Sequence, residues 1–272
     1  MINLTDNEVH LWVLRTAPKE TSDHAACAAL AEAGNGFLDA NEKAHLLRFR
    51  SQGQRRAYLL TRILVRFALS RYAGNIAPAE FRFSDNQHGK PFITEPSLSD
   101  PLFFNVSHSG AMTAVAIGRV REIGLDIQQI DDRTGLLDLA RRYFTPLEYS
   151  RLQSLDGAQL SAGFFSLWTL KEAYSKALGT ALTGTLKKIS FSFPHDGEIR
   201  ADFVADATEK RLAWWFCQVD AGPDYSAALA VGEPAQTGQQ LTHRNIRIVR
   251  WELLALDRVE ERDAGIIASS AR

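Results

Sequence analysis

Apolar and polar positions in the first half of the chain follow two different periods, which predict strands and one long helical stretch. Residues 9–14 alternate as a strand does, and residues 41–72 carry apolar side chains at helical spacing. A strand-like segment at 81–84, a turn at 87–89 and further apolar segments that end at 114–118 follow. We therefore expect a strand, a helix, a hairpin and further strands, in that order.

The second half of the chain repeats this order. A helical run at 162–178 precedes a strand-like segment at 189–193, a turn at 195–197 and apolar segments that end at 228–232. The turn glycines are 108 residues apart (197 minus 89) and the closing glycines are 114 apart (232 minus 118). This nearly constant offset favours duplication of one α+β unit, although similar orders of elements also occur in α+β proteins without duplication.

The repeat predicts an α+β fold of two similar subdomains related by a pseudo-twofold axis. We place the N-terminal half at residues 1–120 and the C-terminal half at residues 121–255, with a last strand at 246–251. Residues 256–272 are expected to form a flexible tail, since chain ends fray unless other parts of the fold hold them.

Composition excludes several classes of protein. The chain has 272 residues, 45% of them hydrophobic, with 31 Lys and Arg against 32 Asp and Glu, and so a net charge of −1. Such a balance gives no overall attraction to nucleic acid or membranes, and no segment approaches the roughly 20 apolar residues of a membrane span. Two distant cysteines and an N-terminus without a basic, apolar leader indicate a cytoplasmic protein with no nucleic-acid or membrane partner.

Two carboxylates in apolar surroundings, Asp126 and Glu172, are the main candidates for chemistry. A buried carboxylate needs a compensating partner such as a metal ion or a base, and magnesium usually binds through one or two carboxylates together with substrate phosphates. Glu172 shares a helical face with Trp168 and Lys176. The alternative interpretation of Glu172 and Lys176 is a surface ion pair of little energetic weight.

Other segments are candidates for binding phosphate. Residues 103–110 run from a strand into a polar turn, where Ser107 and His108 can approach an anion. His108 is equally well explained as a structural histidine, and the lack of a Gly-x-Ser-x-Gly motif argues against a nucleophilic serine. Lys90 lies beside a turn glycine and a proline. The long helical stretch adds positive charge, although a solvated helix face is the favoured interpretation for each of the arginines concerned: Arg55, Arg56 and Arg62.

Five ordered segments together resemble the Sfp-type 4'-phosphopantetheinyl transferases. They are Gly-Lys-Pro at 89–91, Phe-Asn-Val-Ser-His-Ser-Gly at 104–110, Gly-Leu-Asp at 124–126, Phe-x-x-x-Glu-Tyr at 144–149 and Trp-x-x-Lys-Glu-Ala-x-x-Lys at 168–176. The resemblance extends over residues 9 to 255 and implies a monomer of two similar halves with a ligand cleft between them.

The resemblance also implies a reaction. A magnesium-dependent enzyme, with Mn²⁺ as an alternative ion, would transfer the phosphopantetheine arm of coenzyme A to a serine of an apo acyl or peptidyl carrier protein and release 3',5'-ADP. Asp126 and Glu172 would hold the metal, with Glu172 or a metal-bound water as the base. Lys90, Ser107 and His108 would contact coenzyme A phosphates, and Lys176 would contact the pyrophosphate.

Two positions depart from the family pattern. Gln128 stands where many members have a third acidic ligand, so this metal ligand is a neutral amide or is replaced by water. Lysines that meet the 3'-phosphate in some relatives align with Glu42 and His45, which leaves Lys43, His45 or Arg55 as substitutes. The departure at Gln128 supports an alternative function, a non-catalytic module that binds coenzyme A or a carrier protein. A two-metal phosphoesterase is the weakest reading because the additional ligands it requires are not found in the sequence.

Overall fold

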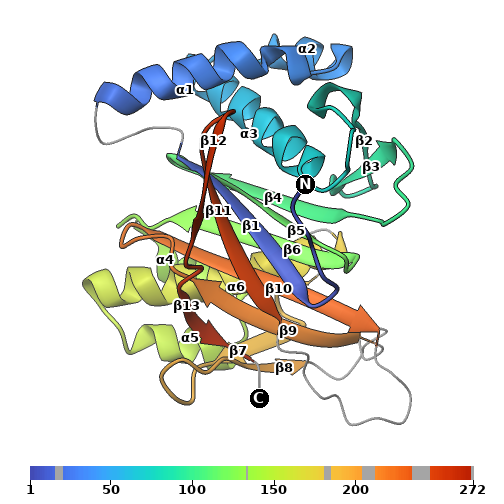
Figure 1. Cartoon of the computed structure of the whole chain (residues 1–272). Helices are drawn as coiled ribbons and strands as arrows, with labels where there is room; N and C mark the ends of the chain where they lie inside the picture. Colours follow the sequence, from blue (N-terminus) through green and yellow to red (C-terminus); the bar gives the residue numbers. More distant parts are fainter. Residues whose placement is uncertain (16–20, 133, 181–184, 204–211, 235–245, 271–272) are drawn as a thin grey trace. The chain divides into compact units, whose positions relative to one another are not determined.

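A computed structural model describes residues 1–15, 21–132, 134–180, 185–203, 212–234 and 246–270. The fold is α+β, as the sequence predicts, and the chain divides into two compact units (Figure 1). Unit 1 comprises Met1–Arg119 and Arg247–Asp263, and unit 2 comprises Val120–Ile246 and Ala264–Arg272. No helix of the described residues is long and apolar enough to cross a membrane.

The core of unit 1 is a five-stranded sheet in the order β12-β11-β1-β5-β4. Its central strand β1 pairs antiparallel with β5 and parallel with β11, so that Trp12 lies between Val115 and Trp251. The five strands are β1 (Glu8–Arg15), β4 (Phe103–Ser109), β5 (Met112–Gly118), β11 (Arg247–Ala255) and β12 (Arg258–Arg262).

Helices and a hairpin complete unit 1. The sequence predicts one helical stretch over 41–72, but the structure divides it into α2 (Ala40–Leu46) and α3 (Gln52–Ser70). An Asp39–Glu42 capping box begins α2, and α3 packs its apolar face on β5. The remaining elements are α1 (Thr21–Gly34), η1 (Asn35–Phe37), η2 (Pro78–Glu80), β2 (Arg82–Asp85) and β3 (Pro91–Glu95).

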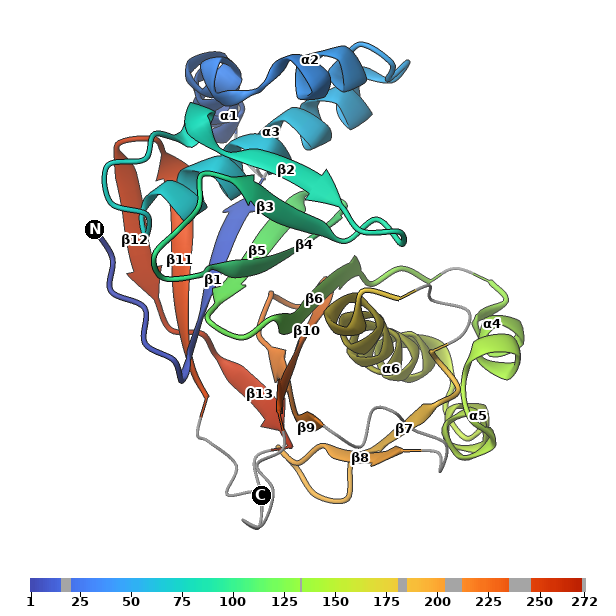
Figure 2. The same cartoon turned by 90° about the vertical axis from the view of Figure 1, so that its right-hand side faces the viewer.

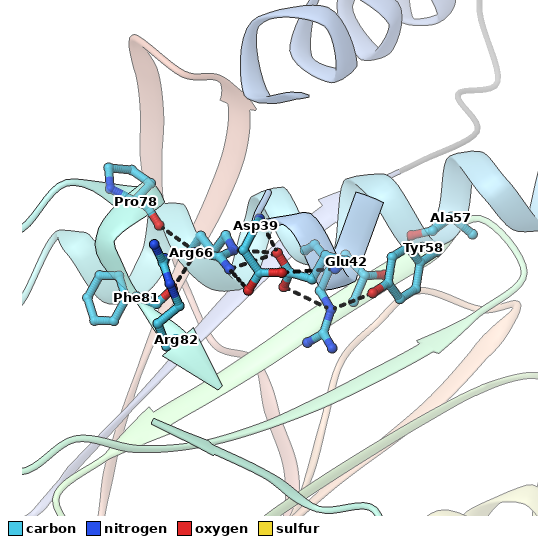
Figure 3. A network of polar contacts seen from close by, with 10 residues as sticks. Asp39, Glu42, Ala57, Tyr58, Arg66, Pro78, Phe81 and Arg82 are labelled. Atoms are coloured by element: carbon cyan, nitrogen blue, oxygen red, sulfur yellow. Dashed lines mark hydrogen bonds and ion pairs between the residues drawn. The ribbon is translucent and has the colours of Figure 1, made fainter. Parts of the chain in front are cut away.

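A fully buried arginine joins these elements of unit 1 (Figure 3). The Arg66 guanidinium donates to Glu42 Oε2 at 2.9 Å, to Asp39 Oδ2 at 3.1 Å and to the Pro78 and Phe81 carbonyls. Because a buried cation is tolerated only with such partners, Arg66 fixes α2 and the β2 hairpin against α3.

Unit 2 contains a four-stranded sheet in the order β13-β9-β10-β6, with helix α6 packed on β6 and β10 (Figure 2). The strands are β6 (Glu122–Gln129), β9 (Leu212–Val219), β10 (Tyr225–Pro234) and β13 (Ile266–Ser269). The other elements are α4 (Leu136–Tyr143), α5 (Pro146–Gln153), α6 (Gly157–Leu178) and a hairpin of β7 (Ile189–Ser192) and β8 (Arg200–Phe203).

The two units share one order of elements, which confirms the repeat seen in the sequence. In each, a first strand (β1 or β6) is followed by helices, a hairpin and a pair of strands, and the last of these returns antiparallel to the first. The registers also correspond: Gly118 lies opposite Val9 in unit 1, and Gly232 lies opposite Glu122 in unit 2.

The structure differs from the sequence prediction at the C-terminus. Residues 247–255 were expected in the second half, but they form β11 of unit 1, because their partner is β1 at the start of the chain. Residues 256–272 were expected to be a flexible tail, whereas β12 and β13 occupy much of this segment. β12 pairs with β11, and β13 extends the sheet of unit 2 beside β9.

Candidate functional site

Helix α6 carries two of the predicted site residues on one face. Trp168, Glu172 and Lys176 follow each other at intervals of four residues, so their side chains leave the helix in the same direction. The helix ends two residues after Lys176 because Gly179 adopts φ 62°, a left-handed conformation that favours glycine. Glu172 and Lys176 therefore occupy the last two turns of a long helix, with buried residues on either side of them.

Strand β6 approaches this helix unusually closely at Gly124. A Cβ atom at Gly124 would lie 1.9 Å from the carbonyl oxygen of Ala173 and 2.5 Å from the nitrogen of Ala177. Only glycine permits this contact between backbones. Asp126 is two residues further along β6 and so points to the same side of the strand as Gly124, towards the helix.

The close packing places Asp126 against Lys176. Asp126 is 1% exposed, and its Oδ1 accepts a hydrogen bond from Lys176 Nζ at 2.7 Å. Its Oδ2 accepts from the side-chain amide of Gln128 at 3.0 Å. The structure thus brings together Asp126 and Gln128 of one predicted segment with Lys176 of another, and it makes Asp126 an ion-pair partner of Lys176.

Glu172 lies next to this pair. The pKa of Glu172 is raised to about 7, chiefly by burial and also by the negative charge of Asp126, while the Lys176 ammonium opposes both effects. Two carboxylates thus share a half-buried site with one ammonium group. Such a site carries excess negative charge when both carboxylates are ionised, and a cation would relieve it.

The donor set of this site fits magnesium. Asp126 and Glu172 offer carboxylate oxygens, and the Gln128 amide can present its oxygen after a simple rotation. In the described part of the chain, no group of three or more His, Cys, Asp or Glu side chains could hold a metal ion. A cation here would depend on this small set, with its other positions left to water or phosphate.

Sequence reasoning missed the roles of Lys171 and Glu148, which occur in the motifs as ordinary charged residues. Both side chains are completely buried, and Lys171 Nζ lies 2.9 Å from Glu148 Oε2. Burial lowers the pKa of Lys171, and the Glu148 carboxylate opposes this change. The spacing offered one sign of this burial, because Lys171 falls on the apolar face of the helix whereas Glu172 lies on a half-buried face.

Unit 1 contains a pocket of about 570 Å³ lined by side chains of α3 and the end of β4. Two predicted phosphate ligands, Arg56 and His108, line it together with Phe49, Tyr58 and Thr61. The Nη2 atom of Arg56 is buried and makes no hydrogen bond within the described residues. An unpaired guanidinium nitrogen at a pocket wall is suited to receive an anion.

The other predicted ligands of unit 1 lie in varied surroundings. Ser107 is buried on β4, and Lys90 is half-buried where the β2–β3 turn ends. Arg55 is exposed and donates to the Phe49 carbonyl at 3.1 Å. Arg62 lies 3.4 Å from the Glu42 carboxylate, so part of its charge is neutralised within the protein.

The positions aligned with the relatives' lysines have different neighbours. His45 is exposed and packs against Tyr58 and Phe49, with ring centroids 4.9 and 5.2 Å away. Lys43 is exposed on α2. Glu42, by contrast, is buried in the Arg66 network and holds the start of α2, which is a structural role.

Comparison with known proteins links this chain to one family. A family model described as the 4'-phosphopantetheinyl transferase superfamily matches residues 122–230, and one described as 4'-phosphopantetheinyl transferase, N-terminal, matches residues 28–119. The 4'-phosphopantetheinyl transferase HetI of Nostoc sp. is 33% identical over 181 residues, which are 66% of this chain and 73% of HetI.

Two further relatives extend the match. A 4'-phosphopantetheinyl transferase of Bacillus subtilis is 30% identical over 72% of this chain and 83% of its own length. A phosphopantetheinyl transferase of Thraustochytrium sp. is 28% identical over 96% of this chain and 90% of its own length. The matched ranges include both the carboxylate site of unit 2 and the pocket of unit 1.

Proposed function

The chain belongs to the 4'-phosphopantetheinyl transferase superfamily and is a transferase of 4'-phosphopantetheine from coenzyme A to a carrier protein, and we propose that Asp126 and Glu172 form its reaction centre. The observation that carries this proposal is the pair of neighbouring carboxylates, of which Glu172 has its pKa raised to about 7. A buried carboxylate beside a half-buried one suits a site that handles a cation and a phosphate.

We propose that Asp126, Glu172 and the Gln128 amide hold magnesium, or manganese in its place. When bound, this ion would neutralise negative charge that builds up on the pyrophosphate as the bond to 3',5'-ADP breaks. The protein's own contribution is to hold the ligands in place beforehand. The contacts of Asp126 with Lys176 and Gln128 do this, because they fix the carboxylate before any ligand arrives.

Lys176 is proposed to bind the pyrophosphate of coenzyme A. Its side chain is 30% exposed, so the ammonium reaches solvent while one of its hydrogens remains on Asp126. A cation held in this way can meet a phosphate oxygen without a large loss of side-chain entropy. In unit 1 we propose that Arg56 and His108 bind a phosphate of coenzyme A, with Ser107 and Lys90 as further contacts and with His45, Arg55 and Arg62 as weaker candidates.

The transfer itself is a substitution at the phosphorus atom that carries the pantetheine arm. The carrier's serine oxygen forms a bond to this phosphorus, the bond to the 3',5'-ADP oxygen breaks, and the serine proton leaves. Glu172 is one acceptor for this proton, since a carboxylate with a pKa of about 7 accepts protons effectively near neutral pH. A water molecule beside the cation is the alternative acceptor, in which case Glu172 acts as a ligand only.

The test is to incubate the protein with magnesium, coenzyme A and an apo carrier protein, and then to weigh the carrier by mass spectrometry. We expect the mass of one phosphopantetheine to be added. Glu172→Gln should lower the rate at least about 100-fold, the scale of loss when a group that stabilises developing charge is removed. Glu32→Gln, an exposed residue of α1, is the matched control and should retain the parent rate.

Absence of the added mass with every carrier tested would favour a non-catalytic binding module. Running the assay with acyl and peptidyl carriers in parallel identifies the preferred acceptor. We propose that the enzyme acts in the cytoplasm as a monomer. Light scattering of the purified protein would check the monomeric state. Near-parent turnover of Glu172→Gln would remove this residue from the mechanism while leaving the transfer reaction itself in place.

A further inference from the structure

The buried Lys171–Glu148 pair lies directly behind the proposed reaction centre and takes no part in the chemistry above. Lys171 precedes Glu172 on α6, but its side chain points into the core, where the ammonium group is completely buried. Nζ donates to the Leu186 and Ile189 carbonyls and to Glu148, so all three of its hydrogens have acceptors.

Glu148 is satisfied equally fully. Its Oε2 accepts from the backbone nitrogen and the hydroxyl of Thr145, both at 2.8 Å, and from Lys171. Its Oε1 accepts from the backbone nitrogen of Phe191 at 2.8 Å. One ion pair therefore connects the start of α5, strand β7, the segment before β7 and the middle of α6.

Stability alone is a weak explanation for this pair. A buried ion pair contributes little net stability compared with apolar residues of similar shape, because desolvation of the two charges offsets their attraction. What such a pair supplies is a strict geometry, since breaking any one of its contacts leaves a buried charge without a partner.

Helix α6 is held on two faces near Glu172. On one, Gly124 of β6 contacts the backbone of Ala173 and Ala177, which sets how closely the strand approaches. On the other, Lys171 is tied to β7 and α5. The strand contact alone resists approach but not rotation of the helix about its axis, whereas a charged anchor on a second face resists rotation. Glu172 lies between these two contacts in the sequence.

We propose that the Lys171–Glu148 pair is a positioning device that fixes the rotation and axial position of α6 and thereby sets the separation of the Glu172 and Asp126 carboxylates. This inference rests on the proposed function of those carboxylates. It gives Lys171 and Glu148 no contact with substrate. Their effect passes through α6 and the side chains that it carries, Glu172 above all.

The test removes both charges together, because either single substitution would leave a buried charge unpaired and lose the fold. The double variant is Lys171→Met with Glu148→Gln, in which the glutamine oxygen still accepts from Phe191. We expect the melting temperature to stay within about 8 °C of the parent. Magnesium added to the protein with coenzyme A should bind at least about 10-fold more weakly by calorimetry.

The second readout is the split between kcat and KM for coenzyme A, which a mere loss of stability would not change. Misplacing a reacting group by about 1 Å can cost about 100-fold in rate, so kcat of the double variant should fall by this factor while KM for coenzyme A changes less than about threefold. Ile199→Val, a buried substitution in the same unit, is the control for mild destabilisation and should keep the parent kcat and magnesium affinity. Parent-like kcat and magnesium affinity in the double variant would overturn the proposal.

Crystal structures of the parent and the double variant separate this inference from the proposed function. We expect the distance between the Asp126 and Glu172 carboxyl carbons to differ between the two proteins. An unchanged distance overturns the positioning role, whatever ion the site binds. If the parent binds no magnesium yet the distance changes, the proposed metal site is wrong and the positioning role stands.

Discussion

Replacing Gly124 with alanine should separate strand β6 from helix α6 and disable the enzyme without unfolding it. The added Cβ would lie 1.9 Å from the Ala173 carbonyl oxygen, 2.5 Å from the Ala177 nitrogen and 2.9 Å from the Ala177 Cβ. Two of these three obstacles are backbone atoms of a regular helix, so no side-chain rotation can relieve the overlap. The strand and the helix must move apart.

The size of the movement follows from the geometry. Opening the shortest contact from 1.9 Å to the 3.4 Å of an ordinary van der Waals contact requires a shift of about 1.5 Å. Asp126 moves with the strand and Lys176 with the helix, so their 2.7 Å hydrogen bond would lengthen beyond hydrogen-bonding range. We expect a stability loss of about 1–3 kcal/mol, typical of overpacking, and a fall in rate of about 100-fold or more.

The assay is transfer to an apo carrier, followed by mass spectrometry, together with urea unfolding monitored by circular dichroism. Gly36→Ala is the matched control, because a Cβ at Gly36 would meet nothing within 4 Å. It should keep the parent rate and should change the free energy of unfolding by no more than about 1 kcal/mol. A Gly124→Ala enzyme with parent stability and turnover would refute the reasoning, because the contact that positions Asp126 would then be dispensable.

Three further predictions concern charge. Gln128→Glu should destabilise the metal-free protein by placing a carboxylate beside Asp126, yet tighten magnesium binding about tenfold by calorimetry; an unchanged affinity would mean that position 128 faces away from the ion. Magnesium affinity should rise with pH up to about 7 and then level off, since Glu172 must lose a proton to bind, and a flat profile would exclude it as a ligand. Burial lowers the pKa of His10, so the unfolded chain takes up a proton at a higher pH than the folded chain does. The free energy of unfolding should therefore fall as pH drops below about 6.5, by at most about 1.4 kcal/mol per pH unit. His10→Gln should reduce this slope.

The geometry behind the last prediction is a buried polar cluster in unit 1. His10 Nδ1 lies 2.7 Å from the Tyr72 hydroxyl and accepts from the Trp251 indole at 3.3 Å, while Trp12 donates to Tyr72 at 2.7 Å. A proton on Nδ1 would face the indole donor of Trp251. Because the nearby carboxylate of Glu8, 3.7 Å from Nε2, favours protonation, the fall in stability is moderated rather than abolished.

The sequence predicted those parts of the molecule that depend on local spacing. The strand at 9–14 and the helix at 162–178 follow from their periodicity, and the repeat in element order follows from the recurring glycine turns. A shared site of Asp126 and Glu172 was predicted from two motifs; in the structure Asp126 accepts a hydrogen bond from Lys176, one turn after Glu172 on α6, and the roles of these residues stay a prediction. The strand, the helix and the repeat share one property, namely that the spacing of side chains within single elements and turns reveals them.

Features that depend on distant partners were not predictable from the sequence. The parallel pairing of β11 with β1 joins residues 239 positions apart. The alternation of residues 246–251 predicts a strand but does not indicate which strand it pairs with. The Glu148–Lys171 ion pair could not be predicted either, because the burial of a charged residue depends on how the surrounding elements pack. The break between α2 and α3 was missed although residues 50–56 carry no apolar side chain and so interrupt the helical spacing.

The path of the chain through the two units has a consequence for synthesis. The polypeptide leaves unit 1 at Arg119 and returns to it only at Arg247, after nearly all of unit 2 has been made. On the ribosome, β1 must therefore wait for its parallel neighbour, with an unpaired edge that could attach to other chains. Neither unit can be cut out as one continuous gene fragment, so a split or truncated version that ends before residue 247 would leave the first sheet incomplete.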